Sequence, residues 1–256
     1  MYRPNKLKEK LQAGEKVAAC WLFSNSSDMA EIVAGAGFDA LMIDHEHGSG
    51  SLQTAIDQYR AARSASDVTI LMRVPWNDTV LIKRSLDAGM DGIMIPSVNT
   101  AEEARAAVAA CRFPPTGIRS AGLGAARAGG YGRMAREYRD NLDKDLMIIC
   151  QIETKEAVGN IESIAAVDGI DMLFIGPNDL SGSINKLGEF DDPEVKALFE
   201  EARDKIKASP AFLGCISKGA QETNDLFAQG FDFLLCAGDT GLVASAAGSL
   251  LKNLKK

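Results

Sequence analysis

The sequence contains no apolar run that approaches the roughly 18 residues of a membrane span, and its N-terminus lacks the apolar core of a signal peptide. It is also short of positive charge, since 28 Lys and Arg residues stand against 35 Asp and Glu residues, for a formal net charge of −7. Proteins that bind nucleic acid usually present a basic face. These absences predict a cytoplasmic protein that has neither membranes nor nucleic acids as partners.

Cysteine and histidine are scarce. The five cysteines form no Cys-x-x-Cys pair and four lie in apolar segments, so we expect reduced, buried thiols and no structural zinc site. The two histidines, His45 and His47, stand in the stretch IDHEHGSG beside Asp44 and Glu46. Such a run after an apolar segment suits a solvated turn, a metal site or an acid–base device. Metal binding by both imidazoles is disfavoured, because nothing in a turn fixes the two rings toward one ion.

Four segments share the pattern Gly, apolar residue, Asp, apolar run. They are GFDALMID from Gly37, GMDGIMIP from Gly89, GIDMLFIG from Gly169 and GFDFLLCA from Gly230. A glycine in the left-handed conformation ends a helix, and the run that follows is typical of a parallel strand buried on both faces. Four further apolar runs alternate with these segments: VAACWLF from Val17, VTILMRV from Val68, LMIICQI from Leu146 and AFLGCIS from Ala211.

Helical patterns separate most of these eight strand candidates. Helices are expected near Ser27 and Ser51, after Asp78, at the capping box of Thr100 and Glu103, after Thr154, Asp192 and Gly219, and from Thr240 to the C-terminus. Strands that alternate with helices in this way predict an α/β protein, a single closed (β/α)8 TIM barrel over residues 1–256. The alternative is an open, doubly wound sheet.

Polar side chains collect where the predicted strands end, which is where such barrels place their active sites. Side chains two apart share a face of a strand, so Gln151 and Glu153 continue the inward face of the fifth strand to its mouth, as Arg73 does on the third. Asp179 follows the sixth strand. Taken singly, Arg73 suits a rim salt bridge and each carboxylate suits a helix cap. Together, at one rim, they favour a functional site.

These residue types point to enolate chemistry. Glu153 and Asp179 on adjacent strands can hold one divalent cation, for which Mg²⁺ or Mn²⁺ is expected and Co²⁺ or Zn²⁺ can substitute. A metal that polarises a 2-oxo acid, Arg73 beside the developing enolate oxygen and a neutral histidine as proton carrier make an aldol cleavage or addition site. The competing Schiff-base mechanism needs a lysine at a strand end. None lies inside the eight strands, and Lys155 and Lys218 lie just beyond two of them.

Six stretches carry a family resemblance: FDALMIDHEH, RVPWND, IKRSLDAGMDGIMIPSVNTAEEARAAV, RFPPTGIR, QIETKEAVGNI and GIDMLFIGPNDLS. In this order and spacing, from about Leu7 to Leu251, the chain resembles the metal-dependent pyruvate aldolases of the HpcH/HpaI family, which cleave 2,4-dihydroxyhept-2-ene-1,7-dioate (4-hydroxy-2-oxoheptanedioate) and are grouped with the citrate lyase β-chain barrels. The resemblance implies a phosphoenolpyruvate/pyruvate-type barrel whose last helix is exchanged with a neighbouring subunit, in a homohexamer that is a trimer of dimers.

The resemblance also implies roles for individual residues. Glu153 and Asp179 match the metal ligands, Gln151 a substrate or metal-water contact, Arg73 the pyruvate-binding arginine, His47 the base, Asp87 the carboxylate that orients this base, Asp44 a positioning residue, and the backbone around Pro177, Asn178 and Asp179 the pyruvate carboxylate site. Two positions depart from the family pattern, because a small residue is common at His45 and Ala at Asn178. His45 is expected to touch the aldehyde portion of the substrate or to face solvent.

The implied reaction is the reversible cleavage of a 4-hydroxy-2-oxo acid to pyruvate and an aldehyde, in the breakdown of aromatic compounds or sugar acids. Two alternatives stay open. A citrate-lyase-β-like acyl-CoA ester lyase would need a basic groove for the CoA phosphates, and only Arg127, Arg133 and Arg136 are scattered where one would form. A barrel that binds a 2-oxo acid without catalysis is disfavoured by the complete set of His, Arg, Glu and Asp.

Overall fold

A closed barrel of eight parallel strands forms the centre of the structure, a computed structural model that describes residues 3–254. The strands pair in chain order, and β8 pairs with β1 to close the ring. They are β1 (Val17–Leu22), β2 (Ala40–Asp44), β3 (Thr69–Arg73), β4 (Gly92–Ile95), β5 (Met147–Ile152), β6 (Met172–Ile175), β7 (Phe212–Ile216) and β8 (Phe233–Gly238). All eight predicted strands are confirmed, and closure excludes the open sheet.

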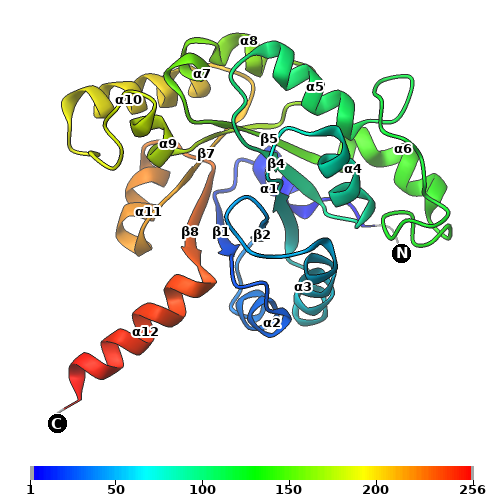
Figure 1. Cartoon of the computed structure of the whole chain (residues 1–256), viewed down its shortest axis with the longest axis horizontal. Helices are drawn as coiled ribbons and strands as arrows, with labels where there is room; N and C mark the ends of the chain where they lie inside the picture. The colour runs from blue at the N-terminus through cyan, green and yellow to red at the C-terminus, as the bar shows by residue number, and fades with distance from the viewer. Residues whose placement is uncertain (1–2, 255–256) are drawn as a thin grey trace.

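Helices surround the barrel (Figure 1). They are α1 (Lys6–Gln12), α2 (Ser27–Gly35), α3 (Leu52–Ala65), α4 (Thr79–Asp87), α5 (Ala101–Cys111), α6 (Ala135–Asp145), α7 (Lys155–Gly159), α8 (Ile161–Ala165), α9 (Pro177–Gly182), α10 (Pro193–Lys207), α11 (Gly219–Ala228) and α12 (Asp239–Asn253). The predicted capping box before α5 is present, with both the Thr100 and the Glu103 bonds formed. Helices α1, α6, α8 and α9 were not predicted from the sequence. Three of these are at most seven residues long, and α6 is strongly polar.

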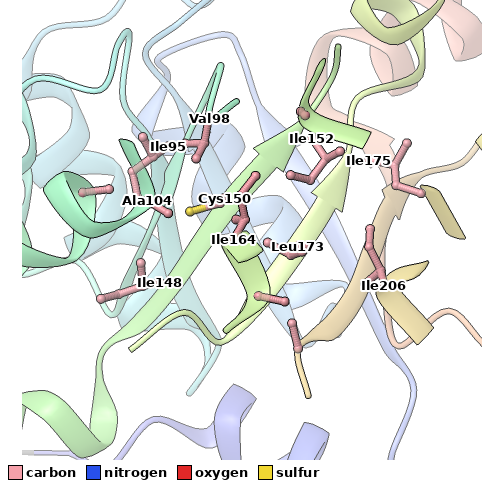
Figure 2. Packing of buried hydrophobic residues seen from close by; sticks show 14 of the residues in the cluster. Ile95, Val98, Ala104, Ile148, Cys150, Ile152, Ile164, Leu173, Ile175 and Ile206 are labelled. Carbon is pink, nitrogen blue, oxygen red and sulfur yellow. The ribbon is translucent and has the colours of Figure 1, made fainter. Parts of the chain in front are cut away.

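The core has an inner and an outer part because strand side chains alternate between the two faces. The inside of the barrel holds one cluster, in which Met147 and Ile149 of β5 meet Leu71 of β3, and α1 adds Leu7 and Leu11. The outward side chains pack beneath the helices. Figure 2 shows part of this outer cluster, including Ile148, Cys150 and Ile152 of β5 and Leu173 and Ile175 of β6. The alternation predicted for β5 is therefore confirmed.

The repeated Gly-x-Asp pattern ties the strands together at the end of the barrel where they begin. Its four carboxylates, the basal aspartates, each accept a hydrogen bond from the backbone N–H of the preceding strand. These bonds are Ala18 N to Asp39 (3.0 Å), Ile70 N to Asp91 (2.8 Å), Ile148 N to Asp171 (2.8 Å) and Leu213 N to Asp232 (3.0 Å). Each also pairs with its own cation, in the same order Lys10, Arg63, Lys8 and Lys16. The same hydrogen bond therefore recurs between β1 and β2, β3 and β4, β5 and β6, and β7 and β8, and an ion pair accompanies it each time.

The last helix stands apart from this packing. In Figure 1, α12 projects away from the barrel instead of covering it. Its apolar side chains Leu242, Val243, Leu250 and Leu251 are between 47% and 65% exposed. The five cysteines are free thiols; four are buried, as predicted, whereas Cys236 is half-buried. No helix within residues 3–254 combines the length and apolarity that a bilayer crossing requires.

Candidate active site

Arg73 lies at the mouth of the barrel, where the strands end. It is the last residue of β3 and follows Leu71 on the inward face, so the strand itself carries the guanidinium to the mouth. Asp44, the last residue of the neighbouring β2, holds it with two hydrogen bonds of 2.8 Å, from Nε and from Nη2. Asp44 is fully buried and Arg73 is 6% exposed. The guanidinium also lies over the Trp21 ring, 4.3 Å from its centroid. Its position is therefore fixed before any ligand binds.

A polar chain continues from Arg73 to the carboxylate of Glu153. Arg73 Nη1 donates to Gln151 Oε1 at 3.5 Å, and Gln151 Nε2 donates to Glu153 Oε2. On its other side, Glu153 Oε1 accepts from the backbone N–H of Ser97 at 2.7 Å and from the Ser97 hydroxyl at 3.0 Å. Ser97 has a φ of +53°, a left-handed conformation that is costly for residues other than glycine and that typically marks functional sites. In this conformation the Ser97 N–H donates its hydrogen bond to Glu153.

The charge around Glu153 favours a bound cation. Burial raises the pKa of Glu153, and the negative charge of Asp179 raises it further, while the hydrogen bonds from Ser97 and Gln151 lower it. A cation between the two carboxylates would relieve this unfavourable pairing. Space beside Glu153 is available because the next strand ends in Gly176, where an added methyl group would lie 2.8 Å from Glu153 Oε2.

Glu153 and Asp179 fit a metal ion that keeps several waters. Within residues 3–254, no group of three or more His, Cys, Asp and Glu side chains could hold an ion. Mg²⁺ commonly binds through one or two carboxylates and completes its shell with water or substrate oxygens, and this donor set is of that type. Asp179 lies in the first turn of α9, where Pro177 is the first residue and Gly176 provides no side-chain cap. The first N–H groups of this helix, at Asn178 and Asp179, have no partner within the helix.

Glu46 is a site residue that the sequence analysis did not single out. Its Oε2 lies 2.8 Å from Arg73 Nη1 and 3.9 Å from His47 Nε2. Burial raises the pKa of Glu46, and Arg73 lowers it. The His47 side chain is 64% exposed and lies on the loop after β2. Alternation along a strand could not place Glu46, because the residue lies beyond the end of β2, where the chain turns. The only sequence signal was its place between the two histidines.

Two predicted site residues lie away from this network. His45 Nε2 is buried without a hydrogen-bond partner and lies beside Asn25 and Gly50, and burial lowers the pKa of its imidazole. Asp87 lies at the C-terminal end of α4, near the basal end of the barrel, where it accepts a bond of 2.6 Å from Arg119. Among the described residues, no contact joins Asp87 to His47. The structure thus brings Arg73, Asp44, Gln151, Glu153, Asp179 and His47 to the mouth, but not Asp87.

Comparison with known proteins agrees with the barrel fold. The model of the HpcH/HpaI aldolase/citrate lyase family matches residues 18–246. A 4-hydroxy-2-oxo-heptane-1,7-dioate aldolase from Salmonella dublin is 40% identical over 246 residues, which are 96% of this chain and 93% of that protein. Among solved structures, an HpcH/HpaI aldolase/citrate lyase family protein from Burkholderia cenocepacia superposes with a TM-score of 0.92 at 31% identity, over 97% of this chain and 98% of the other.

A second solved structure, an HpcH/HpaI aldolase from Desulfitobacterium hafniense, superposes with a TM-score of 0.86 at 27% identity, over 99% of this chain and 98% of that one. The matches span nearly the full length of both partners. The chain therefore belongs to the HpcH/HpaI aldolase/citrate lyase family and is an aldolase, a carbon–carbon lyase.

Proposed function

We propose that this aldolase reversibly cleaves a 4-hydroxy-2-oxo acid into pyruvate and an aldehyde, with a divalent cation held by Glu153 and Asp179. The observation that supports this most directly is the continuous chain from Asp44 through Arg73 and Gln151 to Glu153. It presents a fixed guanidinium and a carboxylate suited to a cation at one mouth. The relatives that act on 4-hydroxy-2-oxo-heptane-1,7-dioate point to substrates of the same class.

The residues divide the chemistry between them. Mg²⁺ or Mn²⁺, when bound, supplies Lewis-acid polarisation of the 2-oxo group. Arg73, held from behind by Asp44, directs Nη1 toward the mouth and stabilises the negative charge that develops on the enolate oxygen as the carbon–carbon bond breaks. Because its donors are already oriented, little reorganisation is needed during the reaction. The exposed His47 accepts the proton of the 4-hydroxyl group, and the N–H groups of Asn178 and Asp179 receive the pyruvate carboxylate.

A coupled assay tests this proposal. Pyruvate release from a panel of 4-hydroxy-2-oxo acids is followed through lactate dehydrogenase, with Mn²⁺ and with EDTA. We expect release with Mn²⁺, loss with EDTA and recovery when Mn²⁺ is added back. Undiminished activity in EDTA would rule out the cation. His47→Ala should also stop exchange of the pyruvate methyl protons with solvent, and exchange at the wild-type rate would remove His47 from its role.

We also propose that α12 packs on a neighbouring copy of the chain, in a homo-oligomer of the hexameric kind that the sequence implies. The support is the exposed apolar face of a helix that projects away from its own barrel (Figure 1). Such faces mark contact surfaces. Asp87 can orient His47 only across a subunit boundary, because within its own chain it is paired with Arg119 near the opposite end of the barrel.

The oligomer can be tested by sedimentation of the double variant Leu250→Asp and Leu251→Asp. Both side chains are more than 60% exposed, so the change leaves the barrel packing intact. We expect a smaller species than the wild type. An unchanged sedimentation coefficient would show that α12 does not hold the assembly together.

A further inference from the structure

We propose that Glu46 is a displaceable counter-ion of Arg73, which occupies the ligand-facing end of the guanidinium and which the 2-oxo oxygen of an incoming substrate must move aside. The inference rests on the proposed function, because it takes the 2-oxo acid as the ligand. Glu46 would thereby lower substrate affinity, because it competes with the 2-oxo oxygen for Arg73.

Arg73 has a single end left for a ligand. Asp44 takes Nε and Nη2 with two hydrogen bonds of 2.8 Å from beneath, and it is fully buried. Nη1 faces Gln151 Oε1 at 3.5 Å and Glu46 Oε2 at 2.8 Å. Asp44 does not use the two N–H groups of Nη1 or the second N–H of Nη2, and these point to the same end of the guanidinium. Any substrate oxygen that Arg73 stabilises must therefore approach this end, where Glu46 already lies beside Nη1.

Glu46 is held less firmly than Asp44. Its Oε2 is close to Nη1, yet it is buried without a hydrogen-bond partner, so no N–H of the guanidinium points at it. Hydrogen bonds weaken steeply with misalignment, and the contact is an ion pair without the directional part that fixes Asp44. The Glu46 side chain is 18% exposed, against 0% for Asp44, and it extends from the loop beyond β2. Of the two carboxylates, Glu46 is the one that can leave.

A destination for the displaced carboxylate lies next to it. His47 Nε2 is 3.9 Å from Glu46 Oε2, and the His47 ring is 64% exposed. Rotation of the Glu46 side chain toward this ring keeps the carboxylate near a polar partner and opens Nη1. The site would otherwise hold several like charges, since Asp44, Glu46 and Glu153 interact electrostatically around the one cation, Arg73.

Displacement and simple charge repulsion predict different ligand dependence. If Glu46 repelled substrate only through space, its removal would tighten binding of an anion and leave a neutral analogue unaffected. If Glu46 must be moved off Nη1, its removal tightens binding of every ligand that places a 2-oxo oxygen there, whatever its charge. Pyruvate and its neutral amide, pyruvamide, carry the same 2-oxo group and differ in net charge.

The experiment is calorimetric titration of the full-length, Mn²⁺-saturated protein with pyruvate and with pyruvamide. Glu46→Gln keeps the size of the side chain and removes its charge. We expect the dissociation constants of both ligands to fall roughly threefold to tenfold, the range that a partly exposed ion pair provides. Glu46→Ala should lower both dissociation constants as well. Two variants are used so that the test remains possible if one of them fails to fold. Glu102→Gln, the same change at an exposed site on α5, should leave both constants unchanged.

If only pyruvate binds more tightly to the variants, charge repulsion explains the effect of Glu46. This result would overturn the inference. Unchanged or weaker binding of both ligands in the two variants would overturn it as well, while the proposed function would stand if the wild type binds pyruvate. A wild-type protein that binds no pyruvate with Mn²⁺ would overturn the proposed function and the inference together.

Discussion

The two ends of the barrel use carboxylates in opposite ways. At the basal end, each of the four basal aspartates has its own cation and its own backbone N–H. At the mouth, Asp44 and Glu46 share one cation, Arg73, and Glu153 lies close enough to Asp179 for their negative charges to interact. The same residue types therefore stabilise the fold at one end and leave an excess of negative charge at the other. A local excess of charge of one sign is typical of functional sites that bind a ligand of the opposite charge.

The buried carboxylates at the two ends also differ in the charges that act on their pKa values. Burial raises the pKa of Asp91 and Asp171 at the basal end, just as it raises that of Glu153 at the mouth. Arg63 lowers the pKa of Asp91 again, and Lys8 does the same for Asp171. At Glu153, the neighbouring negative charge of Asp179 raises the pKa further. Charge is thus compensated at the basal end and accumulated at the mouth, where a divalent cation would balance it.

The largest predicted effect comes from altering Arg73, the cation that Asp44 and Glu46 share. Arg73→Lys keeps the charge, but an ammonium group cannot hold Asp44 with two bonds and also direct a donor toward the substrate. We expect kcat/KM for pyruvate release to fall about 10²-fold to 10³-fold, the usual result of losing one oriented donor at a developing oxyanion. The measurement is the coupled assay with Mn²⁺.

Arg60→Lys provides the matched control, because Arg60 lies on α3 in an exposed pair with Asp57 and takes no part in the site. It should retain wild-type kinetics. If Arg73→Lys stays within threefold of the wild type, a fixed guanidinium is not needed and the contrast between the two ends loses its functional meaning.

A change at the basal end should lower stability and leave activity unchanged. Asp39→Ala leaves the backbone N–H of Ala18 without its acceptor and Lys10 without its counter-ion. We expect the free energy of unfolding to fall by about 1–3 kcal/mol, the typical result of an unsatisfied buried polar group, while kcat/KM of the folded enzyme stays unchanged. Urea denaturation and the coupled assay measure the two quantities. Asp191→Ala, at a fully exposed ion pair with Lys196, should change neither. A large loss of kcat/KM in Asp39→Ala would contradict the division of labour.

The fold could be predicted because its signals are local and repeated. Four Gly-x-Asp segments each end a helix and begin a buried strand, and four further apolar runs alternate with them, so eight strands could be predicted. The structure shows that they pair in chain order. Strand alternation then placed Arg73, Gln151 and Glu153 at the mouth. The function of the repeated aspartates was not visible, because the bond from Ile70 N to Asp91, for example, joins residues whose proximity only the closed barrel creates.

Residues outside the strands were harder to place. Glu46 lies in a loop, where no period tells which way a side chain points, so its contact with Arg73 could not be predicted. Asp87 was assigned by resemblance as the partner of His47, yet helix α4 runs opposite to the strands and carries Asp87 away from the mouth. His45 was expected at the substrate or in solvent, whereas its Nε2 is buried beside Asn25. These outcomes depend on tertiary or quaternary packing.

The smallest predicted effect concerns the pH dependence of stability. The pKa of Glu153 is raised in the folded protein, so the folded state holds this proton more tightly than the unfolded state does. In the window from the ordinary value, 4.5, up to the raised folded value, the folded state binds more protons, and stability falls as the pH rises. Glu153→Gln cannot titrate. In EDTA, its free energy of unfolding should therefore rise relative to that of the wild type between pH 4.5 and pH 7. The gain is modest, since one pKa unit corresponds to about 1.4 kcal/mol.

Saturating Mn²⁺ should reverse this order, because a cation bound to the folded state stabilises the wild type by mass action and the amide is a poorer ligand. Urea denaturation of both proteins at several pH values, with EDTA and with Mn²⁺, measures the four curves. If the free energies of unfolding of the two proteins change in parallel with pH in EDTA, the charged form of Glu153 does not destabilise the folded protein. The mouth would then resemble the basal end, and the imbalance on which a cation site depends would be absent.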